Sequence, residues 1–159
     1  MLLLAVSGAD RPVAFEPRIR SSGLPACWGQ AAVYHALAEG LAGITDTGRA
    51  FDHVGMSPRW EAAGVQEAEV CLHYPASGAC CAYSYRYDKK QDLITLELAG
   101  SFQSATVRCL LPSARSAIQV NADTAALPFR LEKIENSSYA CFDISRQQTI
   151  VIHLADTNK

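Results

Sequence analysis

The chain has 159 residues, of which 49% are hydrophobic and 19% are charged, with 14 Lys and Arg residues against 16 Asp and Glu residues. This composition excludes a disordered or collagen-like chain, and the formal net charge of -2 excludes a strongly basic nucleic-acid binder. The length predicts one domain, or one compact domain with a smaller piece attached. No apolar run approaches the roughly 18 residues of a membrane span, so we expect neither a membrane nor a nucleic-acid partner.

The amino-terminal stretch is apolar from Leu2 to Val6 and reaches a Ser-Gly pair at residue 7. It has no basic segment before it and is too short for a signal peptide, so we expect the end of a buried strand or helix. Without an export signal the chain as given is expected to be cytoplasmic, although the sequence does not fix the compartment. Prolines at 12, 17 and 25 predict an irregular loop before the first helix.

One amphipathic helix is predicted from Gln30 to Ile44. Its apolar residues Val33, Leu37 and Leu41 recur at the spacing of one helical face. Pro25 precedes the segment and a Thr-Asp-Thr-Gly turn follows it, so both ends carry breaker or turn residues. We expect the apolar stripe to cover one face of a sheet.

After Val65 the pattern changes to the alternation of β-strands. Eight segments are predicted as strands, at 66–74, 79–87, 92–99, 104–111, 117–121, 127–133, 138–144 and 148–154. Their spacing, with turn residues between them, is typical of an antiparallel sandwich. The predicted fold is therefore mainly β: an antiparallel β-sandwich of about eight strands with one amino-terminal α-helix packed on it. We divide it into residues 1–56, the lead-in loop and helix, and residues 57–159, the sandwich.

Six cysteines lie at positions 27, 71, 80, 81, 109 and 141. Three of them fall inside apolar strand segments, where a cysteine commonly acts as a small buried hydrophobe. There is no C-x-x-C pair, and the neighbours Cys80 and Cys81 point to opposite sides of a strand. We therefore expect free buried thiols, no metal site and no cofactor.

His35 and Glu39 are four residues apart and share one face of the predicted helix. Such a pair could act as an acid and a base in a small carbohydrate-active enzyme, since the carboxyl and the imidazole can both move protons. The alternative is an ordinary solvated pair on a helix surface. No second carboxylate is placed beside them by the sequence, so a complete active site is not predicted.

Aromatic residues supply a second group of candidates for binding. Tyr83, Tyr85 and Tyr87 alternate along one strand, so their rings lie in a row on one face. Exposed rings in a row would stack on sugars, as in a carbohydrate-binding module, whereas half-buried rings would pack on the sheet. Trp28 and Trp60 lie on either side of the helix and are candidate substrate contacts or anchors between helix and sandwich.

A run from Cys27 to Ile44, CWGQAAVYHALAEGLAGI, is followed by Asp52-His53-Val54 and by Ser57-Pro58-Arg59-Trp60. This arrangement resembles the carboxyl-terminal region of bacterial six-hairpin, (α/α)6-barrel glycosidase-like proteins, in which the last barrel helix leads into a β-sandwich. The later strands resemble that sandwich too, except that Ala122 replaces the usual glycine after Asn121. A looser turn through Asp123 is therefore expected, because an alanine disfavours positive φ.

The resemblance implies a non-catalytic accessory or structural domain of a glycoside hydrolase-like protein, because the barrel that carries catalysis in such enzymes is not part of this sequence. It implies three possible partners: a catalytic barrel domain, another copy of the chain, or carbohydrate. A carbohydrate-binding module using the surface aromatics and a small enzyme using His35 and Glu39 stay open as alternatives.

Overall fold

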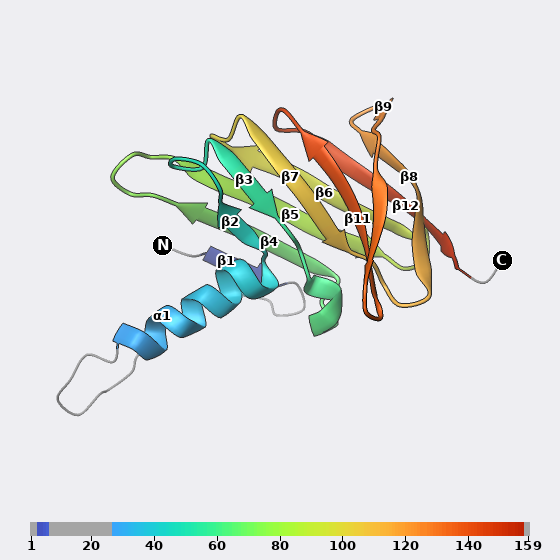
Figure 1. Ribbon diagram of the computed structural model, residues 1–159, viewed down its shortest axis with the longest axis horizontal. Coiled ribbons are helices and arrows are strands. Elements are labelled where there is room, and N and C mark those ends of the chain that lie inside the picture. Colours follow the sequence, from blue (N-terminus) through green and yellow to red (C-terminus); the bar gives the residue numbers. More distant parts are fainter. Residues whose placement is uncertain (1–2, 7–26, 158–159) are drawn as a thin grey trace.

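The computed structural model describes residues 3–6 and 27–157, with side chains from residue 31 to residue 157. Two β-sheets pack face to face, and one helix projects from the end of the sandwich near β1 and β2 (Figure 1). The prediction of a mainly β sandwich with one helix is confirmed.

The larger sheet has seven strands in the order β1-β4-β5-β6-β12-β8-β9, and all neighbours that pair in it are antiparallel. Its strands are β1 (Leu3–Val6), β4 (Glu67–His73), β5 (Cys80–Asp88), β6 (Leu93–Gly100), β8 (Arg115–Ala122), β9 (Ala125–Ala126) and β12 (Thr149–Asp156). The first strand pairs with β4 at one edge, so of the strand or helix expected at Leu2–Val6 a strand forms, at Leu3–Val6.

The smaller sheet has five strands in the order β10-β11-β7-β3-β2. Its strands are β2 (Ile44–Asp46), β3 (His53–Met56), β7 (Ser104–Leu110), β10 (Arg130–Ile134) and β11 (Ser137–Ile144). The pairing of β3 with β7 is parallel, with His53 opposite Ser104 and Met56 opposite Val107. Every other pair in this sheet is antiparallel.

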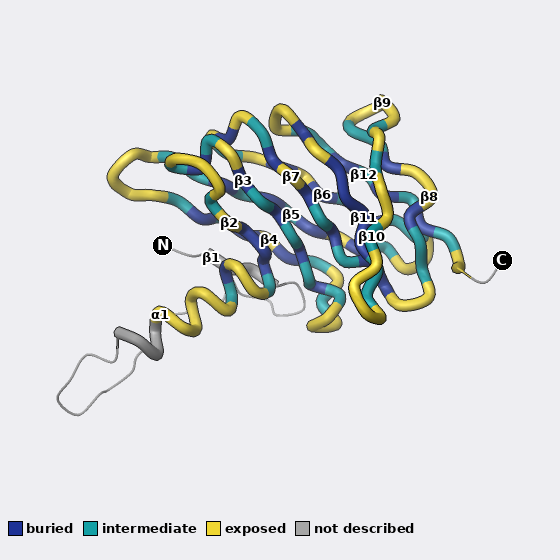
Figure 2. Tube along the Cα trace, in the orientation of Figure 1, coloured by how far each residue is buried: buried dark blue, intermediate teal, exposed yellow. Residues whose placement is uncertain are grey.

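All eight strands predicted from the alternation are present, with ends shifted by up to three residues. In β4, β5, β6 and β7 every second residue is buried between the sheets, as the alternation of the sequence predicts (Figure 2). Ile94, Leu96, Val107, Ile150 and Ile152 are at most 1% exposed. At about 1.5–3 kcal/mol for each large apolar side chain buried, this interface is the main source of stability.

The sandwich begins before residue 57, which corrects the expected division between 1–56 and 57–159. Residues 44–46 and 53–56 form β2 and β3, and β3 pairs along its whole length with β7. Val54 and Met56 are each 2% exposed and belong to the common core. These two strands are therefore part of the sandwich and not of a separate lead-in segment.

The helix is made of α1 (Cys27–His35) and a π-helical continuation, η1 (Ala36–Leu41), and a short 3-10 helix, η2 (Trp60–Ala63), follows β3. The expected covering of a sheet face by the helix is not seen. Residues 31–36 are exposed, Val33 and Tyr34 each at 47%, and burial begins only at Ala38 and Ala42 (Figure 2). The helix therefore meets the sandwich with its last turns, and its body extends into solvent (Figure 1).

The turn after Asn121 follows the expectation. Ala122 still pairs with Ala125 in the β8–β9 hairpin, and Asp123 takes the positive φ of 52°. The carboxylate of Asp123 accepts a hydrogen bond from the backbone N–H of Thr149 at 3.0 Å. Aspartate tolerates this conformation better than alanine, which explains why the loop lies at residues 123–124, two residues later than an Asn-Gly turn at 121–122.

Candidate functional site: the joint between helix and sandwich

The helix ends at Gly43, whose φ of +71° reverses the chain into β2. A side chain at this position would overlap the backbone carbonyl of Ser57. The same close approach allows the Ser57 N–H to donate to the Gly43 carbonyl at 2.8 Å. Glycine is thus required both for the turn and for the contact between helix end and sandwich.

Arg59 holds the helix from the side of the sandwich. Its guanidinium Nη1 donates to the carbonyl of Gly40 at 2.6 Å and to that of Glu39 at 3.4 Å. Its backbone N–H donates to the carbonyl of Leu41 at 3.0 Å. The last carbonyls of a helix have no partner inside the helix and carry its negative dipole end, so a cation placed there is favourable.

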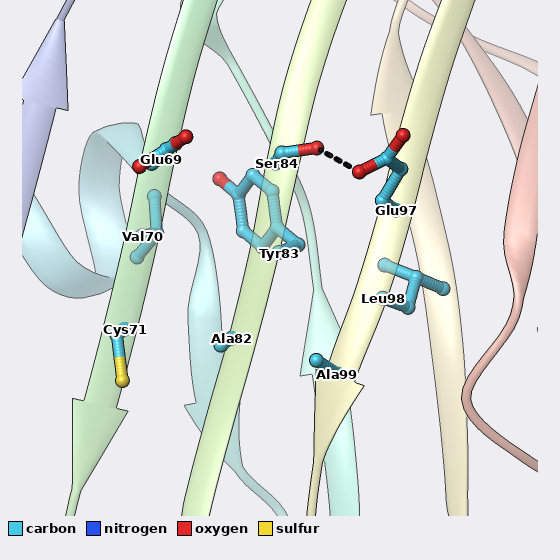
Figure 3. Close-up of a pocket in the computed structure, with 9 residues that line it drawn as sticks. All are labelled: Glu69, Val70, Cys71, Ala82, Tyr83, Ser84, Glu97, Leu98 and Ala99. Atoms are coloured by element: carbon cyan, nitrogen blue, oxygen red, sulfur yellow. Dashed lines mark hydrogen bonds between the residues drawn. The ribbon is translucent and has the colours of Figure 1, made fainter.

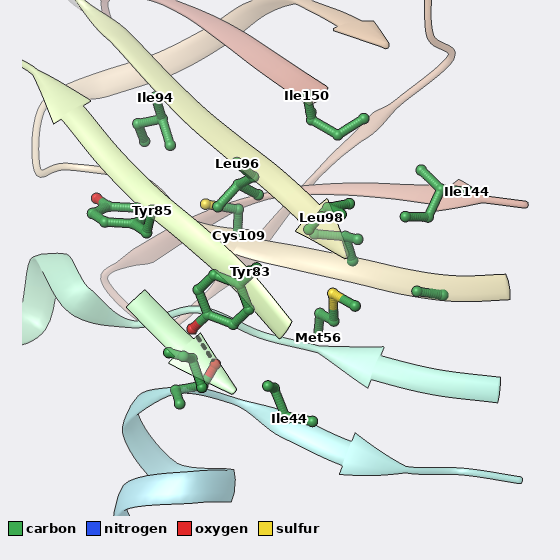
Figure 4. Packing of buried hydrophobic residues seen from close by; sticks show 14 of the residues in the cluster. Ile44, Met56, Tyr83, Tyr85, Ile94, Leu96, Leu98, Cys109, Ile144 and Ile150 are labelled. Atoms are coloured by element: carbon green, nitrogen blue, oxygen red, sulfur yellow. Dashed lines mark hydrogen bonds between the residues drawn. The ribbon is translucent and has the colours of Figure 1, made fainter. Parts of the chain in front are cut away.

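A buried polar chain completes the contact. The indole Nε1–H of Trp60 donates to the hydroxyl of Tyr83 at 2.9 Å, and this hydroxyl donates to the carbonyl of Ala42 at 2.6 Å. Trp60 is 1% exposed and Tyr83 is 3% exposed. Figure 4 shows Tyr83 among the buried hydrophobic side chains. Burial raises the pKa of the Tyr83 hydroxyl well above its usual range, which keeps it protonated as a donor.

Together these groups form what we call the joint, defined by residues 39–43, Ser57, Arg59, Trp60 and Tyr83. Five successive carbonyls, from Glu39 to Gly43, accept hydrogen bonds from the sandwich. The unpaired backbone carbonyls at the end of a helix ordinarily bond to water or to a single capping group. Here the direction in which the helix leaves the sandwich is fixed by groups on two separate pieces of chain, residues 57–60 and β5.

The row of tyrosines points inward, which corrects the expectation of a surface for sugar stacking. Tyr83, Tyr85 and Tyr87 are 3%, 2% and 6% exposed, because this face of β5 lies against the smaller sheet. The hydroxyl of Tyr85 is buried without a hydrogen-bond partner. Trp60 has the role of an anchor, and the side chain of Trp28 lies outside the described residues.

His35 and Glu39 contact each other as the helical spacing predicts, with Nδ1 of the histidine 3.3 Å from Oε1 of the glutamate. Their side chains are 69% and 46% exposed. The pair lies on the surface of the projecting helix and not in a cavity between helix and sheet. It therefore has the form of a solvated pair, and a small enzyme built on these two residues has no enclosed site.

One depression of about 320 Å³ lies on the outer face of the larger sheet, across β4, β5 and β6 (Figure 3). The depression forms because the side chains of Cys71, Ala82 and Ala99 are small. Glu69 and Glu97 also line it. Ser84 donates to Glu97 at 3.4 Å. This surface was not predicted, because it depends on which residues of three strands lie opposite one another.

Of the residues that make the joint, sequence reasoning singled out Trp60, as a substrate contact or an anchor between helix and sandwich, and Tyr83, as a ring for sugar stacking or for packing on the sheet. It missed Arg59 and Gly43 as functional positions. A glycine directly after a helical pattern is a known end signal. The partner of Arg59 is 19 residues away and has no local signal.

The fold and the joint define the class of this protein as a two-sheet β-sandwich that carries one helix held by its end. Comparison with models of known families, with curated proteins and with solved structures finds no match. Within the described ranges, no helix has the length and apolar character to cross a membrane. In the same ranges, no group of three or more His, Cys, Asp or Glu side chains is placed to hold a metal ion.

Proposed function

We propose that this chain is a non-catalytic accessory domain of a glycoside hydrolase-like protein, and that it holds its helix in a fixed direction for packing against a helical barrel. The observation that carries the proposal is the contrast within one helix. Its end is held by five hydrogen-bonded carbonyls, whereas residues 31–36 are exposed.

The exposed part of the helix has the composition of an interface. Val33 and Tyr34 are large and apolar, and alanines at 31, 32 and 36 allow a neighbouring helix to come close. A helix that is exposed to water without a packing partner has little stability, since most helical stability in proteins comes from tertiary packing. The resemblance to the last barrel helix of six-hairpin glycosidases supplies the partner: the remaining helices of an (α/α)6 barrel.

The test is reconstitution of a complex in solution. The full chain is mixed with the barrel of a six-hairpin glycosidase from which the last helix and the sandwich have been removed, and complex formation is followed by size-exclusion chromatography with light scattering. We expect one chain to bind one barrel and to raise its melting temperature. Val33→Glu should abolish binding while leaving the melting temperature of the isolated chain unchanged, because Val33 is 47% exposed.

Ile118→Glu is the matched control, since Ile118 is 63% exposed and lies on β8, in the sandwich and not in the helix. Absence of a complex, or equal binding by the Val33 and Ile118 variants, contradicts the proposal. Hydrolysis of oligosaccharides by the chain alone contradicts its non-catalytic character. Saturable oligosaccharide binding that Glu97→Gln removes would favour the carbohydrate-binding alternative, with the depression as its site.

A further inference from the structure

The cysteines of the sandwich divide into two kinds. Cys81, Cys109 and Cys141 are buried, and burial raises the pKa of their thiols to about 12, about 12 and about 11. Thiols of this kind are protonated at neutral pH and react slowly with oxidants. Cys71 and Cys80 are partly exposed, which makes them the accessible thiols among residues 31–157.

These two accessible thiols lie on the same face of neighbouring strands. In the pairing of β4 with β5, Cys71 is opposite Ala82 and Cys80 is opposite His73. All four residues point to the outer face, because Leu72 and Cys81 between them are buried. Cys71 and Cys80 are therefore diagonal neighbours, with Cα atoms roughly 7–8 Å apart by general sheet geometry.

The Cys71 sulfur points along its own strand. Figure 3 shows it directed along β4 toward the carboxyl end of the strand, where the next outward residue, His73, faces Cys80. The backbone of Cys80 is itself held in place, since its N–H and carbonyl both bond to Ser101. Both thiols also lie close enough to Cys81 to contribute to the increase in its pKa.

We propose that Cys71 and Cys80 form a reversible disulfide across β4 and β5, so that the outer face of the larger sheet responds to oxidising conditions. With glutathione disulfide as the oxidant, the thiolate of one cysteine attacks it and releases one glutathione. The second thiolate then attacks the protein sulfur of the mixed disulfide and releases the other glutathione. Two protein thiols lose their protons and are oxidised, and one glutathione disulfide is reduced to two thiols.

The geometry favours a switch over a permanent crosslink. Disulfides span Cα separations up to about 6.8 Å, so closure requires a small backbone movement at the two diagonal positions and leaves the bond strained. Strained and accessible disulfides are the ones that cellular thiols reduce again. The bond would cross the end of the depression that Cys71 lines, and its formation would change the shape of that surface.

The experiment uses the folded full chain carrying Cys27→Ser, so that the thiol of residue 27 plays no part. After treatment with glutathione disulfide, free thiols are counted and the intact mass is measured. We expect the loss of two thiols and two hydrogen atoms, without a retained glutathione, and full reversal by dithiothreitol. Cys71→Ser and Cys80→Ser should instead each retain one glutathione, because the second thiol that would release it is missing.

Cys109→Ser is the matched control and should still lose two thiols, since its side chain is buried in the core. Circular dichroism before and after oxidation establishes that each variant is folded. The proposal is overturned if the parent chain keeps all its thiols or accumulates glutathione adducts. It is also overturned if the Cys80→Ser variant still closes an internal bond, which would assign the reaction to Cys81. Failure of barrel binding leaves these outcomes unaffected, since the thiol chemistry does not depend on the proposed function.

Discussion

The indole N–H of Trp60 and the hydroxyl of Tyr83 meet at 2.9 Å in the core, although 23 residues separate them in the chain. The hydroxyl accepts from the indole and donates to the carbonyl of Ala42, so both of its hydrogen-bonding capacities are used. Burying a polar group costs free energy unless the group has a hydrogen-bond partner. In this series of hydrogen bonds each polar group has one. The end of the helix is thereby connected to the centre of β5.

Tyr83→Phe is predicted to destabilise the protein by about 2–3 kcal/mol, because the substitution leaves both the indole N–H and the Ala42 carbonyl without their partner. Tyr85→Phe is the control on the same strand. Its hydroxyl is buried and has no partner, so removing it should be neutral or stabilising. Urea unfolding at neutral pH measures both, and equal losses for the two variants would contradict the role assigned to the polar chain.

Gly43→Ala and Gly64→Ala form a second matched pair. Both glycines have a φ near +70°, but a side chain would meet the Ser57 backbone at Gly43 and open space at Gly64. The Gly64 variant should lose only the cost of a left-handed alanine, about 1–2 kcal/mol. The Gly43 variant should lose clearly more, because the helix end must move away from Ser57. Thermal unfolding of the two variants checks this order, and the reverse order would refute it.

Arg59→Ala should loosen the helix while leaving the sandwich intact. The substitution removes the donor to the carbonyls of Gly40 and Glu39 but leaves the apolar core in place. We expect amide hydrogen exchange in residues 36–42 to become several-fold faster, with little change in β5 and β12. Arg146→Ala, which removes a 73% exposed side chain, is the control and should leave exchange in the helix unchanged.

Stability is predicted to fall in alkaline solution. Burial raises the pKa of Cys81 and Cys109 from the ordinary value of 9.0 to about 12. Between pH 9 and pH 12 the unfolded chain releases these protons and the folded chain keeps them, so the free energy of unfolding decreases as pH rises. Each thiol contributes a slope of about 1.4 kcal/mol per pH unit in that window.

Denaturant titrations from pH 8 to pH 11 measure this slope. Cys109→Ala should reduce its steepness, even though the cavity lowers stability at neutral pH by a constant amount. Tyr83 and Tyr85 also have raised pKa values, so a residual slope is expected above pH 10. An unchanged slope in the Cys109 variant would show that this thiol does not govern the effect.

Much of the sandwich was predictable because its signal is local. Strands β4, β5, β6, β7 and β12 alternate over at least seven residues, and that alternation directly reports which side faces the core. The short strands β2 and β3 were missed, since three or four residues beside Gly48 and Gly55 carry too little pattern. The parallel partner of β3 lies about fifty residues downstream and has no sequence signal.

The candidate site was harder to predict than the fold. The spacing of the three tyrosines placed them on one face of β5, but which face is inside depends on where the strand lies in the sheet. The helix was correctly predicted, but its apolar stripe was wrongly paired with a sheet face, because an amphipathic pattern does not identify the surface against which the apolar side packs. The hydrogen bonds of Arg59 depend on tertiary geometry alone.

The position of β12 has a consequence for the order in which this protein assembles. The strand is the latest in sequence of those described, yet it lies inside the larger sheet, between β6 and β8. Ile150, Ile152 and Leu154 enter the core from it. During synthesis β6 and β8 therefore lack their shared partner until residues 149–156 have been made, and the two parts of the sheet can join only after that.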